Sequence, residues 1–284
     1  MKHLIIILLL FSGIMGVFAK NRLDAPINYL VIANSTLEGN QSLIDFISWK
    51  TEKGFQITTH FVDSTATIEE IDLWVEQQYE SMDPNPQFLL LIGDSNGPFT
   101  VKTQEDNLPP GPGDIISDLI YGVIGDITST NRIPEIFVGR FSVRTEEDLA
   151  VQVNKTIWYE KEQFITSADI SFLENALGVS NNNEAYFLYR NAVIAYGWDY
   201  YFNDTYVNPY TGTTNSMNGI TYTYPHADTL TLISNIIGDI NDGIAFYFYI
   251  GNADKVQLKF PFFTIDDVNN LENQYEYPVV AIGG

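Results

Sequence analysis

The sequence predicts an α/β fold with a mainly parallel sheet that is covered by helices on both faces. Segments typical of strands alternate along the chain with segments typical of amphipathic helices, as in parallel sheets with crossover helices. Two strand segments, Phe88–Ile92 and Ile244–Ile250, are uninterrupted apolar runs, as expected for strands buried on both faces. The chain has 284 residues, 45% of them hydrophobic, which suits one large domain or two closely packed subdomains.

The first third of the chain is expected to form strands and helices in alternation. The helix at Ser42–Lys53 carries its apolar residues on one face and ends before Gly54. The next helix begins with a capping box between Thr67 and Glu70. The strands expected around these two helices are Asn28–Ala33, Gln56–Val62 and Phe88–Ile92.

A loop rich in Gly and Pro, from Asp94 to Ser117, is expected to separate two subdomains. We predict a smaller N-terminal α/β subdomain at 26–116 and a second subdomain at 117–284. The elements expected in the second subdomain are a short strand ending at Gly125-Asp126, a strand at Ile136–Phe141, a helix from about Thr145, a strand at Asn175–Val179, a helix at Ala185–Tyr196, irregular or edge strands within 199–226, a helix from Asp228 to Ile240, strands at Ile244–Ile250 and Pro278–Ile282, and between these two a short helix at Thr264–Leu271.

Charge and the N-terminus restrict the partners and the location of the protein. The net charge of −22 argues against nucleic acid or an anionic membrane surface as partner, whereas the excess of carboxylates suits solubility, calcium binding or cationic partners. Residues 1–19 combine Lys2, the apolar run Leu4–Phe18 and a small residue at Ala19, which predicts a cleavable signal peptide; an uncleaved anchor is the alternative. We therefore expect a secreted or cell-envelope protein without a membrane span in its mature chain.

Several short motifs occur in an order that is more informative than any one of them. They are Phe46-Ile47-Ser48-Trp49-Lys50 with Lys53-Gly54, Leu91-Ile92-Gly93-Asp94, Ser117-Asp118 with Tyr121-Gly122, Val138-Gly139-Arg140-Phe141, Glu147-Asp148-Leu149 and Ile157-Trp158-Tyr159-Glu160. In this order they resemble the catalytic domain of the gingipain family, the C25 cysteine peptidases. The resemblance implies a caspase-like three-layer α/β/α sandwich, cysteine endopeptidase ancestry, a polypeptide substrate or protein ligand, and no required cofactor.

The family's catalytic residues fall near the C-terminal end of this chain. Its histidine lies in a Gly-His-Gly turn after a strand like Ile244–Ile250, and the resemblance places Asn252 at that position. An asparagine cannot take up a proton near neutral pH, so Asn252 is expected to be inactive as a general base. Asp254 is no substitute, because a carboxylate is a poor base for a thiol unless its pKa is raised.

The family's cysteine follows the next strand and would fall just past Gly284; this chain contains no cysteine. Its chemistry is thus either truncated or lost. The residues expected to line a cleft beside Asn252 are Gly251, Asp254, Gly283 and Gly284.

Three functions therefore stay open. The first is a secreted gingipain-type cysteine endopeptidase domain with an incomplete catalytic pair, and the second is a non-catalytic pseudopeptidase that acts as a binding or adhesion module. The third is a serine hydrolase, because Gly93–Gly97 matches G-x-S-x-G after a strand and places Ser95 as nucleophile, although Pro98 opposes the helix that should follow. Asp94 and Asp114 are weak candidates for a structural calcium ion, without EF-hand spacing.

Overall fold

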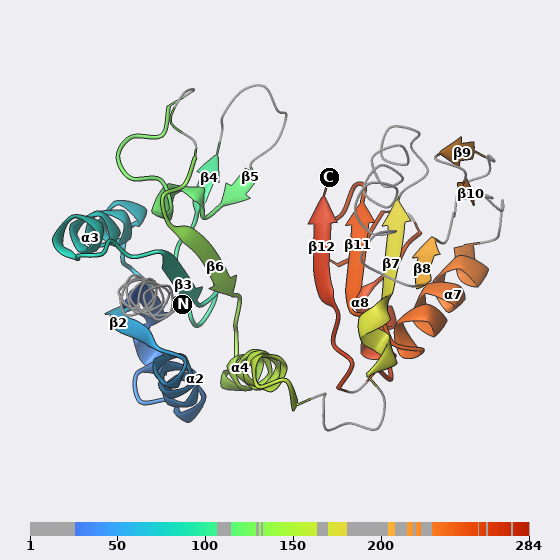
Figure 1. The fold of residues 1–284 in the computed structure, drawn as a ribbon. Coiled ribbons are helices and arrows are strands. Elements are labelled where there is room, and N and C mark those ends of the chain that lie inside the picture. The colour runs from blue at the N-terminus through green and yellow to red at the C-terminus, as the bar shows by residue number, and fades with distance from the viewer. Residues whose placement is uncertain are drawn as a thin grey trace, which may run out of the picture. The chain divides into compact units, whose positions relative to one another are not determined.

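The computed structural model of the chain describes residues 26–106, 115–128, 131, 133–163, 170–180, 204–207, 215–217, 220–222, 229–254, 256–259, 261–273 and 275–283. The chain divides into two compact units, Met1–Ile157 and Trp158–Gly284, and each contains a parallel sheet with helices (Figure 1). The predicted signal peptide at residues 1–19 lies outside the described residues. Within the described ranges, no helix has both the length and the apolar character needed to cross a bilayer.

The sheet of the first unit has four parallel strands in the order β2-β1-β3-β6. The central strand β1 (Ile27–Asn34) pairs with β2 (Phe55–Val62) on one side and with β3 (Phe88–Ile92) on the other. Strand β6 (Phe137–Phe141) pairs with β3 at the far edge. These four strands confirm those predicted at Asn28–Ala33, Gln56–Val62, Phe88–Ile92 and Ile136–Phe141.

Helices cover both faces of this sheet, as a three-layer fold requires. Helix α3 (Ile68–Ser81) packs on one face, and α2 (Gln41–Glu52) and α4 (Glu146–Glu160) pack on the other (Figure 1). The capping box at the start of α3 is present, because Thr67 accepts from the Glu70 N–H while the Glu70 carboxylate accepts from the Thr67 N–H.

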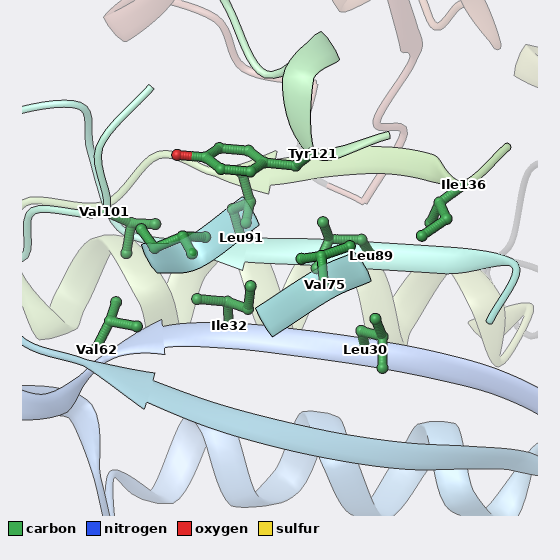
Figure 2. Close-up of a cluster of buried hydrophobic side chains, with 10 residues drawn as sticks. Leu30, Ile32, Val62, Val75, Leu89, Leu91, Val101, Tyr121 and Ile136 are labelled. Carbon is green, nitrogen blue, oxygen red and sulfur yellow. The ribbon is translucent and has the colours of Figure 1, made fainter. Parts of the chain in front are cut away.

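The two cores of the first unit follow from the alternation of side chains along its central strands. Figure 2 shows the α3 side, where Leu30 and Ile32 of β1 and Leu89 and Leu91 of β3 meet Val75. The intervening residues of both strands point into the core beneath α2 and α4; they are Val31, Ala33, Leu90 and Ile92. Every residue of β3 after Phe88 is buried, which confirms the expectation of a central strand.

The segment after residue 117 differs from the prediction of a short strand ending at Gly125-Asp126. A 3-10 helix, Leu119–Tyr121, stands there and is followed by a turn and bends. The ring of Tyr121 is fully buried in the core beneath α3. Burial of this ring favours the 3-10 turn over the extended strand that we predicted. The loop before it holds an antiparallel pair, β4 (Gln104–Asp106) with β5 (Ile115–Ser117), which the sequence did not reveal.

The predicted subdomain boundary at residue 116 falls inside the first unit, because β6 pairs with β3. The division into 26–116 and 117–284 stays a prediction about the domains of the protein.

The sheet of the second unit has four parallel strands in the order β12-β11-β7-β8. They are β7 (Asn175–Ser180), β8 (Asp204–Val207), β11 (Phe246–Ile250) and β12 (Val279–Gly283). Helix α7 (Thr229–Asn241) contributes Ile236 and Ile240 to the core of this unit, which also contains Tyr247 and Tyr249 of β11. The predicted strands at 175, 244 and 278 are thus confirmed.

The remaining elements in the described ranges are short. They are the 3-10 helices η1 (Ser35–Leu37), η2 (the Leu119–Tyr121 turn above) and η4 (Ser171–Glu174), the antiparallel pair β9 (Asn215–Met217) and β10 (Ile220–Tyr222), and α8 (Ile265–Asn269). Strand β8 confirms an edge strand within 199–226. The helix predicted at Ala185–Tyr196 lies outside the described residues.

Candidate functional site

The topology of the second sheet indicates where a ligand would bind. Strand β7 is the first described strand of this sheet, and it has β8 on one side and β11 on the other. The strand order therefore reverses between β7 and β11, and open parallel sheets bind ligands outside the carboxyl ends of their strands at such a reversal. Ser180 ends β7 and is the register partner of Ile250, which ends β11. The residues that follow Ile250 are therefore the first candidates for a ligand-binding site.

Asn252 lies two residues beyond the end of β11 and is exposed. Ile250 is paired both with Ser180 and with Gly283, the last residue of β12, so the three strand ends lie at one edge. Gly251 is buried and has φ 153°, a conformation that side-chain-bearing residues rarely adopt. The structure thus brings Gly251, Asn252 and Gly283 to one edge, whereas Gly284 lies outside the described residues.

The backbone of Asn252 is held by two hydrogen bonds to its carbonyl oxygen. The Oη of Tyr249 donates one, at 2.9 Å, and the backbone N–H of Lys259 donates the other, at 2.8 Å. Tyr249 is fully buried in the core of the unit. The loop after β11 is therefore connected directly to the hydrophobic core at position 252.

Asp254 stabilises the same loop. Its carboxylate accepts hydrogen bonds from the N–H groups of Val256 and Gln257, at 2.9 and 3.0 Å, and forms an ion pair with Lys259. The hydrogen bond from Lys259 and those from the backbone lower the pKa of Asp254 to about 2. A carboxylate with so low a pKa remains ionised and is a weak proton acceptor, so the geometry gives Asp254 a structural role in the loop.

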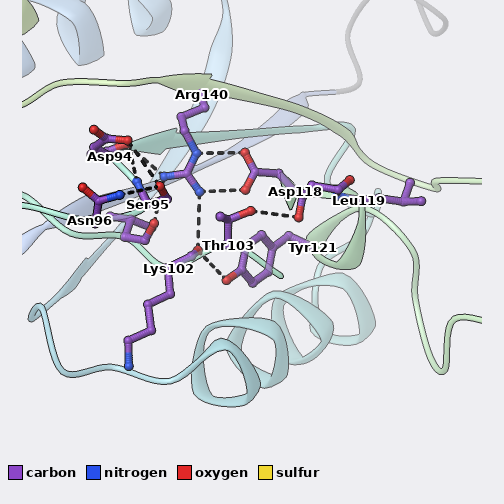
Figure 3. Close-up of polar contacts among 12 residues, drawn as sticks. Asp94, Ser95, Asn96, Lys102, Thr103, Asp118, Leu119, Tyr121 and Arg140 are labelled. Atoms are coloured by element: carbon purple, nitrogen blue, oxygen red, sulfur yellow. Dashed lines mark hydrogen bonds and ion pairs between the residues drawn. The ribbon is translucent and has the colours of Figure 1, made fainter. Parts of the chain in front are cut away.

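The carboxyl edge of the first sheet holds a second polar cluster, centred on Arg140 (Figure 3). The Arg140 guanidinium pairs with both carboxylate oxygens of Asp118, at 2.7 and 2.8 Å, and donates to the carbonyls of Gly93 and Val101. Only 14% of the Arg140 side chain is exposed. The partners of Arg140 are Asp118 and backbone carbonyls at and after the end of β3. The cluster therefore has a structural role: it connects the end of β6 to the end of β3 and to the loop after it.

Ser95 and Asp94 lie beside this cluster in the turn after β3. Asp94 accepts from the Ser95 N–H at 2.7 Å and pairs with Arg144 at 2.7 Å. Partial burial opposes ionisation of Asp94, but the hydrogen bonds from Ser95 and Arg144 outweigh it and lower the pKa of the carboxyl group. Bends and a turn follow Ser95, so the strand–turn–helix arrangement of a serine nucleophile elbow is absent from this described segment.

No metal-binding cluster is found where the structure describes the chain: no group there of three or more His, Cys, Asp or Glu side chains could hold an ion. Asp94 is engaged by Arg144, and Asp114 lies outside the described residues. The ring of His60 is stacked on Trp74, with centroids 4.6 Å apart, and burial lowers the pKa of His60.

Comparison with known proteins agrees with the sequence motifs. The family model "Peptidase family C25" matches residues 22–283. Lys-gingipain of Porphyromonas gingivalis is 26% identical over 275 residues, which cover 92% of this chain and 14% of that protein. Gingipain R2 of the same species is 26% identical over 262 residues, which cover 88% of this chain and 31% of that protein. This chain therefore spans less than a third of either relative.

A solved structure supports the fold. The crystal structure of the Arg-specific cysteine proteinase gingipain R superposes with a TM-score of 0.67 at 23% identity, and the match covers 91% of this chain and 54% of that one. The complex of the pro- and mature domains of the same proteinase gives the same TM-score. The caspase-like α/β/α sandwich expected from the motifs is thus confirmed.

Proposed function

Because this chain belongs to peptidase family C25, we propose that it is a gingipain-type cysteine endopeptidase domain that binds polypeptides and whose catalytic pair is incomplete within these 284 residues. The observation that carries the proposal is the place of Asn252. It follows β11 beside the strand-order reversal, where the resemblance to the family puts the catalytic histidine.

The chemistry of acyl transfer explains why this substitution matters. A cysteine peptidase needs a thiolate to attack the scissile carbonyl and a base that takes the thiol proton and returns it to the leaving amine. The carboxamide of Asn252 can donate and accept hydrogen bonds but cannot shuttle a proton near neutral pH. The nearest carboxylate of the loop, Asp254, has its pKa lowered rather than raised.

The sheet edge beside Asn252 can still bind a peptide. Peptide groups present both N–H and C=O, and an asparagine side chain can pair with either. Lys-gingipain and gingipain R2 are peptidases by family, so a polypeptide ligand is the class of partner that we propose for this chain. The net charge of −22 disfavours nucleic acid as an alternative ligand.

The test uses fluorescein-labelled casein as an unfolded polypeptide probe. We expect a saturable rise in fluorescence anisotropy when the chain is added, and no release of acid-soluble fluorescence over hours at pH 7. Asn252→His alone should leave casein uncleaved, because the chain has no cysteine. Failure of the unaltered chain to bind casein would contradict the proposal.

The alternative, a pseudopeptidase that serves as a binding or adhesion module, is favoured by the same asparagine. The two proposals differ in what the transcript encodes after the codon for Gly284. A cysteine codon directly beyond it supports the endopeptidase lineage with an altered base, whereas a stop codon there supports the binding module.

Casein cleavage by the unaltered chain would instead support the hypothesis of a serine hydrolase that uses Ser95 as nucleophile. In that case a fluorophosphonate should label the protein and Ser95→Ala should abolish both labelling and cleavage.

Secretion and calcium are further parts of the proposal. We propose that residues 1–19 are a cleavable signal peptide, so that N-terminal sequencing of protein collected from the culture medium should begin at Lys20. We also propose that any bound calcium is structural rather than catalytic. Its removal by EGTA should then lower the melting temperature without changing casein binding at 20 °C.

A further inference from the structure

Tyr249 connects the hydrophobic core of the second unit to the candidate site. Its ring is fully buried in the core that α7 covers, among residues such as Val179 and Ile236. Its hydroxyl group donates a hydrogen bond of 2.9 Å to the carbonyl oxygen of Asn252, three residues further along the chain. One side chain therefore reaches from the packed interior to the backbone of Asn252, the position where the resemblance places the family's base.

The rest of the loop is organised around the same carbonyl oxygen. The N–H of Lys259 donates to it at 2.8 Å, and Ala253 and Leu258 form a β-bridge just inside this bond. Asp254 accepts two further backbone N–H groups and the Lys259 ammonium. These contacts close the loop from 251 to 259 on itself, and the Tyr249 hydroxyl contacts it at the Asn252 carbonyl oxygen, just beyond the end of β11.

We propose that Tyr249 is a positioning residue for the ligand site: its hydroxyl fixes the backbone of Asn252 and thereby directs the side chain at position 252 toward a bound polypeptide. This inference rests on the proposed function, namely polypeptide binding at the β7–β11 edge. The Asn252 carbonyl already accepts two hydrogen bonds, so the contribution of this residue to a peptide ligand comes from its carboxamide.

The same strand offers a matched control. Tyr247 precedes Tyr249 by two residues, so both side chains point to the same face of the sheet, and both lie in the same core. The Tyr247 side chain is also buried, but its hydroxyl oxygen has no hydrogen-bond partner among the described residues. Replacing either tyrosine by phenylalanine removes one oxygen atom and keeps the ring, but only one of the two changes releases the loop.

The experiment compares Tyr249→Phe and Tyr247→Phe in the intact chain. We expect Tyr249→Phe to weaken binding of fluorescein-labelled casein by about fivefold, which corresponds to one hydrogen bond, and Tyr247→Phe to leave it unchanged. Hydrogen exchange, followed by mass spectrometry, should quicken in peptides covering 251–259 for Tyr249→Phe only. Far-ultraviolet circular dichroism confirms that both variants are folded before binding is compared.

The outcomes separate the two proposals. If the unaltered chain binds casein and both variants bind equally well, Tyr249 has no positioning role while the proposed function stands. If both variants lose affinity to the same extent, the cause is a general disturbance of the core and the inference is overturned. If the unaltered chain does not bind casein, the proposed function fails and this inference fails with it.

Discussion

Asp72 is expected to make the first unit less stable at neutral pH than at acidic pH. It lies on α3, and its Oδ1 atom is buried without a hydrogen-bond partner in the part of the chain that the structure describes. This burial, together with the negative charges of Glu76 and Glu69, raises the pKa of Asp72 from an ordinary value of 3.8 to about 6. In the unfolded chain the carboxyl group returns to its ordinary pKa, so the folded state holds the proton more tightly.

The sign of the effect follows from this difference. The stabilisation that comes from the bound proton is complete below pH 3.8 and is lost as the pH rises through about 6. A shift of this size would correspond to about 3 kcal/mol for a fully desolvated group, but Asp72 is only partly buried, so we expect about 1 kcal/mol after solvent screening. Asp72→Asn, which mimics the protonated acid, should therefore stabilise the unit by about 1 kcal/mol at pH 7 and by almost nothing at pH 4.

Urea unfolding from pH 4 to pH 8, followed by tryptophan fluorescence, to which Trp74 on the same helix contributes, measures this difference. Glu80→Gln is the matched control, because Glu80 is an exposed carboxylate of α3 and its loss reports the general effect of removing one negative charge. A gain from Asp72→Asn that is equal at pH 4 and pH 7, or no larger than that of Glu80→Gln, would refute the reasoning.

Three further predictions concern stability, each measured by urea unfolding of the variant and the unaltered chain. Arg140→Ala should cost about 3 kcal/mol because it removes a guanidinium that is only 14% exposed and that also bonds two backbone carbonyls, whereas the Arg144 guanidinium is 58% exposed and Arg144→Ala should cost less than about 1 kcal/mol; equal costs would contradict this. Gly243 has φ +95° and an added Cβ would meet Phe172 Cβ at 2.8 Å, so Gly243→Ala should destabilise, while Gly238→Ala, with open space inside α7, should stabilise by about 0.5–1 kcal/mol. Thr67→Ala removes the cap of α3 and should cost about 1 kcal/mol; no loss would mean that the capping box is not formed in solution.

The fold was predictable where local sequence and tertiary packing make the same demand. The apolar run at Phe88–Ile92 can be buried only as a central strand, and the capping box at Thr67 marks the start of α3 because its two hydrogen bonds are local. The 3-10 turn at Leu119–Tyr121 was missed because the burial of Tyr121 depends on contacts distant in sequence. The antiparallel pair β4–β5 was missed for a different reason: its strands are only three residues each and flank a Pro-rich stretch, so neither carries a recognisable strand pattern.

The candidate site shows the same division between local and distant information. Position 252 could be chosen from the sequence because it follows an apolar strand, at the place where the resemblance puts the histidine of the family's Gly-His-Gly turn. The hydroxyl of Tyr249 could not be connected with it, because an inward-facing tyrosine in a buried strand reads as core from the sequence alone. The sheet topology adds an argument that uses no relative at all: the strand order reverses between β7 and β11, and Asn252 stands just beyond that point. Two independent lines of reasoning therefore converge on one edge, and an amide in the place where the resemblance puts a proton acceptor is the ground on which we propose binding rather than catalysis for this chain.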